Sequence, residues 1–224
     1  MTKKHALFVI GTDTDIGKTY ICGEIAKILC KKGIKTGYYK AALSGAEYID
    51  GKLCPGDAEY VKKLSGDEEF NYKVSYIFEE AVSPHLAAEI NNTDIKMDKI
   101  KKDFEKIYAE NEFIIAEGRG GIICPVSISG ERIFLEDVID VLETDMILVA
   151  QSGLGSINSV ILSYEYSKKM KSDIKAVIMN KFEEGNIIHE DNKRMIESLT
   201  GLPVYRCING KPDNEIMELI KKYF

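Results

Sequence analysis

Residues 11–19 have the sequence GTDTDIGKT and lie between an apolar run and an amphipathic stretch. In a strand–loop–helix unit of this kind, backbone N–H groups of the loop and of the helix N-terminus converge on phosphate oxygens. Gly17 lets the backbone approach the ligand, Lys18 supplies a positive charge for the outer phosphates, and the Thr19 hydroxyl is placed to hold Mg²⁺. The usual pattern, G-x-x-x-x-G-K-[ST], has glycine where this chain has Thr12. Because the strand–loop–helix context is intact, the stretch predicts a phosphate-binding loop (P-loop) and nucleotide binding rather than a chance glycine turn.

Short apolar runs alternate with amphipathic stretches on the C-terminal side of this loop. Together with the run before the loop, they predict strands over Ala6–Ile10, Lys35–Tyr39, Phe113–Ala116, Met146–Ala150, Lys175–Met179 and Pro203–Cys207. Helices are predicted over Thr19–Lys32, Asp57–Leu64, Met97–Tyr108, Ser156–Met170, Glu190–Leu199 and Asn214–Tyr223. Such alternation favours right-handed crossovers and a mainly parallel sheet with helices on both faces. We therefore expect an α/β fold and, since no repeat or long linker interrupts the chain, one P-loop domain over residues 1–224.

Composition narrows the class of partner. Acidic residues (36) outnumber basic ones (30), and the net charge of −6 argues against nucleic acid or an anionic membrane as the main partner. The longest apolar runs have five residues, whereas a membrane span needs about 20. No signal-peptide pattern opens the chain, so a cytoplasmic protein is expected. The five cysteines form no CxxC pair, and the three scattered histidines predict no zinc site.

Three charged residues at the ends of predicted strands or at the start of a predicted helix are candidates for binding Mg²⁺ or for catalysis. A P-loop holds Mg²⁺ through a hydroxyl and one or two carboxylates. Glu117 ends an apolar strand and precedes glycines, which is typical of a phosphate or metal edge but also of a turn or helix-capping glutamate. Asp57 begins a predicted helix, so it is a candidate metal ligand and a candidate N-cap. Lys40 follows the second predicted strand and is a candidate catalytic residue as well as a candidate surface lysine. The irregular stretch Ala41–Gly56 that follows is where an open α/β sheet collects its ligand.

A side-chain amide follows the fifth predicted strand, in the sequence Asn180-Lys181-Phe182-Glu183. This stretch is similar to the N-K-x-D with which small GTPases bind guanine, and the amide of Asn180 is well placed for a purine edge. However, no glycine in the chain has an aspartate three residues before it, so the D-x-x-G switch is missing from the sequence. A GTP switch is therefore disfavoured.

Five motifs occur in a characteristic order: Gly11–Thr19, Tyr39-Lys40 with Ser44-Gly45, Ser83-Pro84-His85, Glu117-Gly118 with Gly120-Gly121, and Gly153–Asn158. Together they resemble dethiobiotin synthetases, over about residues 6 to 180. The resemblance implies a homodimeric P-loop α/β fold with about seven strands. It also implies an ATP- and Mg²⁺-dependent cyclo-ligase of biotin synthesis. Such a ligase joins CO₂ to 7,8-diaminononanoate through a carbamate and a mixed carbamic–phosphoric anhydride, and closes a cyclic urea.

The same resemblance assigns roles by position. It implies nucleotide binding by Asp15, Ile16, Gly17, Lys18, Thr19, Tyr20, Asp57, Glu117, Gly118, Arg119, Gly120, Asn180 and Lys181, with Asn180 facing the adenine. The implied Mg²⁺ ligands are Thr19, Asp57 and Glu117, and the implied catalytic residues are Lys40 and Lys18. Substrate contacts would be Thr14, Ser44 and, across the dimer interface, Gly155, Ser156 and Asn158, at a helix start that suits a carboxylate. Arg119 stands where that family usually has a small residue.

Two other classes of protein share part of this pattern. A partition-type ATPase acts as a switch through dimerisation and a macromolecular partner, and it would need a basic or amphipathic exposed surface. The net charge of −6 and the scattered lysine pairs do not indicate such a surface. An amidotransferase that activates a carboxylate would need a glutaminase domain, for which 224 residues leave no room. The ligase is therefore the prediction, and the partition-type ATPase is its alternative.

Overall fold

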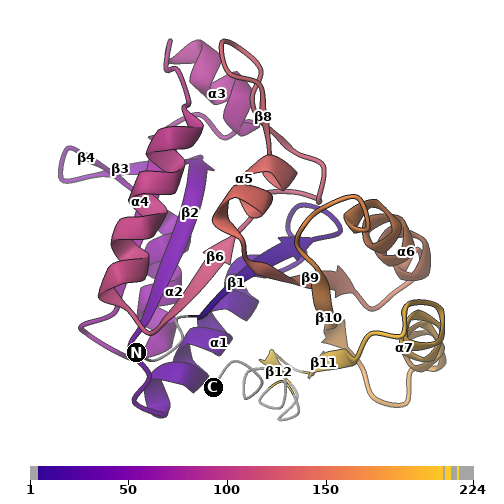
Figure 1. Cartoon of the computed structure of the whole chain (residues 1–224). Helices are drawn as coiled ribbons and strands as arrows, with labels where there is room; N and C mark the ends of the chain where they lie inside the picture. The colour runs from indigo at the N-terminus through magenta and orange to yellow at the C-terminus, as the bar shows by residue number, and fades with distance from the viewer. Residues whose placement is uncertain (1–4, 209, 213–215, 217–224) are drawn as a thin grey trace.

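A central sheet of eight strands organises the chain in the computed structural model, which describes residues 5–208, 210–212 and 216 (Figure 1). The strands lie in the order β12-β11-β10-β9-β1-β6-β2-β5, and all pair in parallel except β12, which pairs antiparallel with β11. Their bounds are β1 His5–Gly11, β2 Thr36–Ser44, β5 Asn71–Phe78, β6 Phe113–Glu117, β9 Asp145–Gln151, β10 Ile174–Phe182, β11 Val204–Ile208 and β12 Lys211–Pro212. Two hairpins complete the strands, β3 Glu47–Ile49 with β4 Lys52–Cys54 and β7 Pro125–Ser127 with β8 Ile133–Phe134.

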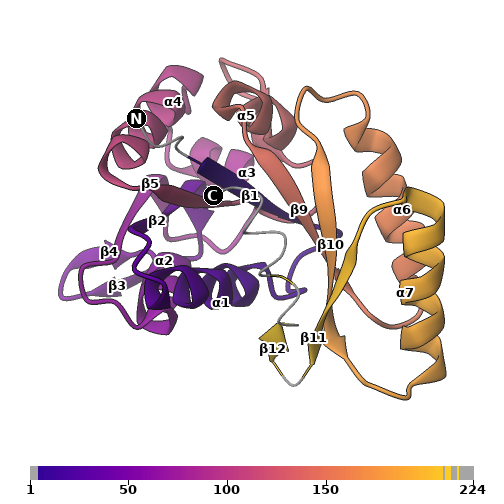
Figure 2. The same ribbon diagram turned by 60° about the horizontal axis from the view of Figure 1, so that its bottom comes forward.

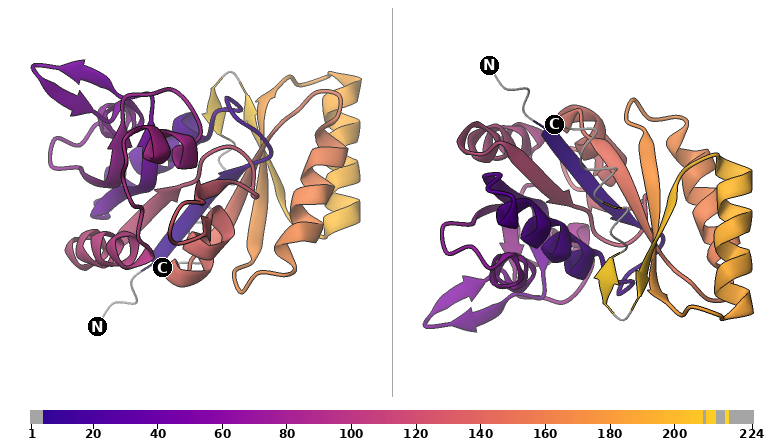
Figure 3. Two further views of the ribbon diagram at one scale, coloured as in Figure 1. Left: turned by 90° about the horizontal axis from the view of Figure 1, so that it is seen from above. Right: turned by 90° about the horizontal axis from the view of Figure 1, so that it is seen from below.

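Helices cover both faces of this sheet (Figures 2 and 3). On one face, α1 (Lys18–Lys31) and α2 (Gly56–Ser65) pack over a core that includes Leu7 and Val9 of β1. On the other face, the core includes Phe8 and Ile10 of β1. The helices that contribute to this second core are α3 Pro84–Ile90, α4 Met97–Glu110, α5 Leu135–Leu142, α6 Ser156–Ser167 and α7 Ile187–Thr200. Both faces of the central strand are thus buried, which explains why β1 has a continuous apolar sequence.

The predicted parallel α/β fold is confirmed, and all six predicted strands are found. Seven of the eight sheet strands are parallel, in keeping with the expected number. The edge strand β5 was not predicted, because Asn71, Lys73 and Ser75 interrupt the apolar run that a buried parallel strand would show. Helices α3 and α5 were not predicted either, since each has at most eight residues. Helix α6 ends at Ser167, before the predicted end, and the helix predicted over Asn214–Tyr223 lies outside the described residues apart from Ile216.

The sheet order brings distant residues to one edge. Strand β1 lies between β6 and β9, and β6 lies between β1 and β2, so the loops after β1, β2 and β6 meet at the carboxyl edge of the sheet. Glu117 is opposite Val9 of β1 and opposite Lys40 of β2 in the strand register. The P-loop, Lys40 and Glu117 therefore share one edge, although they come from three segments of the sequence.

Candidate active site

The P-loop is held in shape by a side chain from a distant strand. Gly17 has φ of 96°, a left-handed conformation that favours glycine, and an added Cβ there would lie 2.2 Å from Nδ2 of Asn180. That amide, at the end of β10, donates to the carbonyl oxygen of Ile16 at 2.8 Å. Lys18 Nζ donates to the carbonyl oxygen of Asp13 at 2.6 Å, and burial lowers the pKa of its ammonium. The loop is thus held both by Asn180 of β10 and by the contact between its own Lys18 and Asp13.

Lys40 is the centre of a group of charges. Its Nζ lies 2.5 Å from Oδ2 of Asp57 and 2.8 Å from Oε1 of Glu117. The Lys40 side chain is 4% exposed and that of Glu117 is 1% exposed, whereas that of Asp57 is 38% exposed. Burial alone would lower the pKa of Lys40, but the two carboxylates outweigh burial and raise it, so this ammonium stays charged.

Glu117 receives hydrogen bonds from three directions. Besides Lys40, the Thr19 hydroxyl donates to Oε1 at 2.9 Å, and the Tyr38 hydroxyl donates to Oε2 at 2.9 Å. Burial and the Glu117 carboxylate raise the pKa of Tyr38 and of the neighbouring Cys22 thiol well above their usual values. Both groups therefore stay protonated, and the carboxylate is surrounded by donors that fix its orientation.

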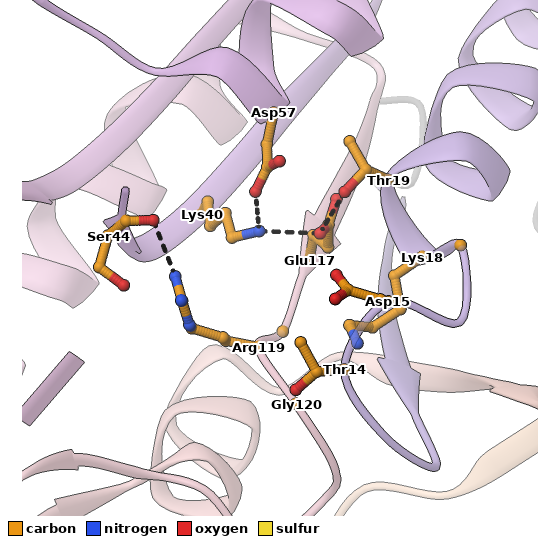
Figure 4. A pocket seen from close by; sticks show the side chains of 12 residues that line it. Thr14, Asp15, Lys18, Thr19, Lys40, Ser44, Asp57, Glu117, Arg119 and Gly120 are labelled. Atoms are coloured by element: carbon orange, nitrogen blue, oxygen red, sulfur yellow. Dashed lines mark hydrogen bonds and ion pairs between the residues drawn. The ribbon is translucent and has the colours of Figure 1, made fainter. Parts of the chain in front are cut away.

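These groups open into a cavity of about 420 Å³ (Figure 4). Its lining residues are Thr14, Asp15, Gly17, Lys18, Thr19, Lys40, Ser44, Asp57, Glu117, Gly118, Arg119 and Gly120. Each of these twelve positions was predicted as a nucleotide, metal, substrate or catalytic residue. Figure 4 shows the Arg119 side chain extending toward Ser44, whose carbonyl oxygen accepts from Nη1 at 3.0 Å. The cavity thus combines a phosphate loop with acidic and basic side chains from other strands.

The residues around Lys40 suit a hard divalent cation. Thr19, Asp57 and Glu117 offer hydroxyl and carboxylate oxygens, which are the donors that Mg²⁺ prefers. A cationic group, the Lys40 ammonium, already lies between the two carboxylates. The local chemistry therefore favours positive charge at this point.

The structure also separates the alternatives that the sequence leaves open. Asp57 is the second residue of α2, the N-cap position is Pro55, and no side-chain capping bond is present there. Its carboxylate binds Lys40 instead. Lys40 is buried and is no surface lysine, and Glu117 is the last residue of β6 with its carboxylate directed to Lys40.

The remaining predicted residues lie outside the cavity lining. Ile16 is buried, and the Tyr20 hydroxyl donates to the carbonyl oxygen of Gly210. The Asn180 amide makes one hydrogen bond at each of its polar atoms: Nδ2 donates to Ile16, and Oδ1 accepts from the backbone N–H of Lys181 at 2.9 Å. In this structure the side chain anchors the P-loop, and its contact with adenine stays a prediction. The predicted substrate residues Gly155, Ser156 and Asn158 lie at the start of α6, with Gly155 and Asn158 exposed and Ser156 buried.

Sequence reasoning missed Tyr38. The alternation of side chains along a strand could have indicated it. Tyr38 lies two residues before Lys40 on β2, so the two side chains face the same side of the sheet. An aromatic residue with a polar hydroxyl at that position can reach the carboxylate that binds the lysine.

Known proteins match the chain over most of its length. A family model described as an AAA domain matches residues 5–215. A protein of Clostridium botulinum (strain Loch Maree / Type A3), named ATP-dependent dethiobiotin synthetase BioD, is 49% identical over 95% of this chain and 94% of its own length. The chain belongs to the ATP-dependent dethiobiotin synthetase family. A second dethiobiotin synthetase, from Clostridium botulinum (strain Eklund 17B / Type B), is 48% identical over 97% of each chain.

The fold is shared more widely than this family. A ParA family ATPase from Chlorobium tepidum TLS superposes with a TM-score of 0.59 over 96% of this chain and 88% of its own, at 15% identity. That identity shows the fold alone. Among the described residues of this dethiobiotin synthetase family member, no helix is long and apolar enough to cross a bilayer.

Proposed function

We propose that this chain uses ATP to join CO₂ to 7,8-diaminononanoate and to close the cyclic urea of dethiobiotin. Family membership supports this activity. The structural observation that carries it is the Lys40 ammonium, held between Asp57 and Glu117 within the cavity that the P-loop lines. That arrangement gathers positive charge where phosphoryl oxygens and an anionic acceptor would meet.

Mg²⁺ would be held by Thr19, Asp57 and Glu117, whose oxygen donors suit it. When bound, it would neutralise charge on the nucleotide phosphates. Glu117 is kept in orientation by the Tyr38 and Thr19 hydroxyls.

The chain's own residues supply charge and position rather than a nucleophile. Lys18 would contact the outer phosphates, and Lys40 would contact the transferred phosphoryl group. The cavity lining, among the described residues, holds no cysteine or histidine. The acceptor must therefore bring its own nucleophile. A carbamate does so, since its carboxylate oxygen can attack the γ-phosphorus and release ADP.

The substrate tail would be bound across a homodimer. Gly155, Ser156 and Asn158 lie at the start of α6, where the helix dipole favours a carboxylate. To test this, Lys40→Ala protein would be mixed with Asn158→Asp protein, because one hybrid site would then carry neither change. Recovered activity supports the shared site. No recovery, with subunit exchange shown by mass spectrometry, supports a site within one chain.

The reaction is tested by product analysis. Purified protein with Mg-ATP, diaminononanoate and bicarbonate should form ADP, phosphate and cyclic urea in equal amounts, and omitting either acceptor component should leave only slow ATP hydrolysis. If the ATPase rate ignores both components but rises with a protein, DNA or lipid partner, the partition-type alternative holds instead.

Two coarser expectations accompany this function. A single domain is supported by the one continuous sheet that runs from β5 to β12. A cytoplasmic location stays a prediction from the sequence.

A further inference from the structure

The cavity has three basic lining residues, Lys18, Lys40 and Arg119, and the mechanism proposed above uses only the two lysines. Arg119 lies two residues beyond the end of β6, is half-buried, and lines the cavity. Its Nη1 donates to the carbonyl oxygen of Ser44 at 3.0 Å. Within the described part of the chain, no carboxylate lies within ion-pair distance of its guanidinium, whereas Lys40 in the same cavity contacts two.

An arginine in this condition is suited to an anionic ligand. A guanidinium carries five N–H donors in a planar fork that matches a carboxylate. The contact with Ser44 uses one donor and holds the side chain across the cavity. The remaining donors make no hydrogen bond to any other described residue, and the positive charge has no protein counterion there.

The carbonyl oxygen that Arg119 contacts lies further along β2 than Lys40. Lys40 and Glu117 are directly opposite each other on β2 and β6. Ser44 is four residues further along β2, which corresponds to roughly 13 Å at the usual rise per residue. In Figure 4, Arg119 extends toward Ser44 and away from Lys18, the lysine of the phosphate loop. Arg119 thus lies beyond the carboxylates proposed to hold Mg²⁺, where the group that accepts the phosphoryl would enter.

We propose that Arg119 binds the carbamate of the substrate, an inference that rests on the proposed function. The carbamate forms when an amine nitrogen attacks the carbon of CO₂ and then loses a proton to solvent, which leaves a carboxylate on nitrogen. Arg119 pairs with one oxygen of this carboxylate, and the other oxygen attacks the γ-phosphorus and displaces ADP.

The same contact serves the ring closure. The second amine attacks the carbamoyl carbon, and the electron pair of the C=O bond moves to the oxygen that Arg119 holds. When this C=O bond re-forms, the C–O bond to phosphate breaks, phosphate leaves, and the attacking nitrogen loses its proton to solvent. A guanidinium at that oxygen stabilises the charge that develops there.

The experiment compares Arg119→Ala and Arg119→Lys with the unchanged protein. Arg194→Ala is the matched control, because it removes the same charge from an exposed position on α7, where Arg194 pairs with Asp191. Steady-state kinetics give KM for diamine, bicarbonate and ATP separately. Independently of turnover, ¹³C NMR with labelled bicarbonate and diamine, without ATP, detects carbamate bound to the protein.

For Arg119→Ala we expect kcat/KM for diamine and bicarbonate to fall by at least about tenfold, the size of a lost hydrogen bond to a charged group. The bound carbamate signal should disappear, while the thermal shift by Mg-ADP stays unchanged. Arg119→Lys should restore part of the signal, because it keeps the charge and loses the fork. Circular dichroism checks folding. If the alanine variant unfolds, the lysine variant is compared with the unchanged protein instead, and a smaller fall in kcat/KM for diamine and bicarbonate is expected.

Two results overturn the inference while the proposed function stands. In the first, the unchanged protein makes the cyclic urea and the Arg119 variants keep their diamine and bicarbonate kinetics and the carbamate signal. In the second, the variants lose Mg-ADP binding and raise KM for ATP alone, which assigns Arg119 to the nucleotide. If the unchanged protein makes no cyclic urea, the proposed function itself fails.

Discussion

Removing the charge of Lys40 should destabilise the protein before any ligand is added. The perturbation is Lys40→Met, which removes the ammonium and keeps an unbranched side chain that is one atom shorter. Glu117, with a side chain 1% exposed, would lose its cation and keep only the Tyr38 and Thr19 hydroxyls. Leaving one partner of a buried ion pair unpaired costs about 3–5 kcal/mol. Because two hydroxyl donors remain and Asp57 is 38% exposed, the lower end, about 3 kcal/mol, is expected.

A domain of this size loses about 2–4 °C in Tm for each kcal/mol, so Lys40→Met should melt about 6–12 °C below the unchanged protein. Adding Glu117→Gln should recover part of this loss, since the unpaired charge is then gone. The matched control is Lys99→Met, because Lys99 pairs with Asp103 at the surface, with a side chain 46% exposed, and should lose much less.

The assay is thermal unfolding followed by circular dichroism, with and without Mg²⁺. The metal should raise the Tm of Lys40→Met more than that of the unchanged protein, because no ammonium competes for the two carboxylates. A melting temperature within about 2 °C of the unchanged protein, which is less than 1 kcal/mol, would refute the energetic argument. An equal Mg²⁺ response in both proteins would refute the assignment of Asp57 and Glu117 as metal ligands.

Three further predictions follow from single contacts. Tyr38→Phe removes a donor to Glu117, so it should cost about 1–3 kcal/mol in the free energy of unfolding and raise the Mg²⁺ concentration needed for half-maximal activity; Tyr39→Phe, on the opposite face of β2, should leave that requirement unchanged. Burial lowers the pKa of Lys18 in the free protein and bound phosphates should raise it, so Mg-ADP affinity should fall as pH rises through the lowered pKa. Calorimetry in buffers of different ionisation enthalpy should then show proton uptake at alkaline pH, and its absence would contradict the assignment. Asn180→Ala leaves a P-loop carbonyl unpaired and should cost about 1–3 kcal/mol in stability while weakening Mg-ADP binding; unchanged denaturant unfolding and binding would show that the anchor is dispensable.

Local chemistry made much of the fold and site predictable. The continuous apolar runs identified strands buried on both faces, and the glycine–lysine–threonine of the P-loop has few other uses at a strand–helix junction. Lys40, Asp57 and Glu117 could be proposed because each adjoins a predicted element at the ligand-binding edge. Their assembly into one ion-paired group depends on the strand order, which the sequence does not state.

Other features depend on tertiary contacts that leave no local pattern. The sequence suggests the Asn180 amide as a base contact, but it gives no sign of the hydrogen bond that the amide donates to a carbonyl oxygen 164 residues earlier in the chain. Strand β5 is polar in its first half because it lies at an edge, so its sequence does not look like that of its parallel neighbours. In both cases the position within the sheet decides the role.

The ion pair between Lys40 and Glu117 also has a consequence for how the strands align during folding. Side chains alternate along a strand, so a shift of β2 by one residue against β6 that brings Ala41 opposite Glu117 would turn Lys40 to the opposite face, into the place of Tyr39. The ammonium would then be buried where Tyr39 now packs against Phe104, and Glu117 would lose its cation. Such a misaligned sheet would carry two unpaired buried charges. The residues that we assign to phosphoryl transfer therefore also penalise the wrong strand alignment, and selection on folding and selection on chemistry act on the same pair.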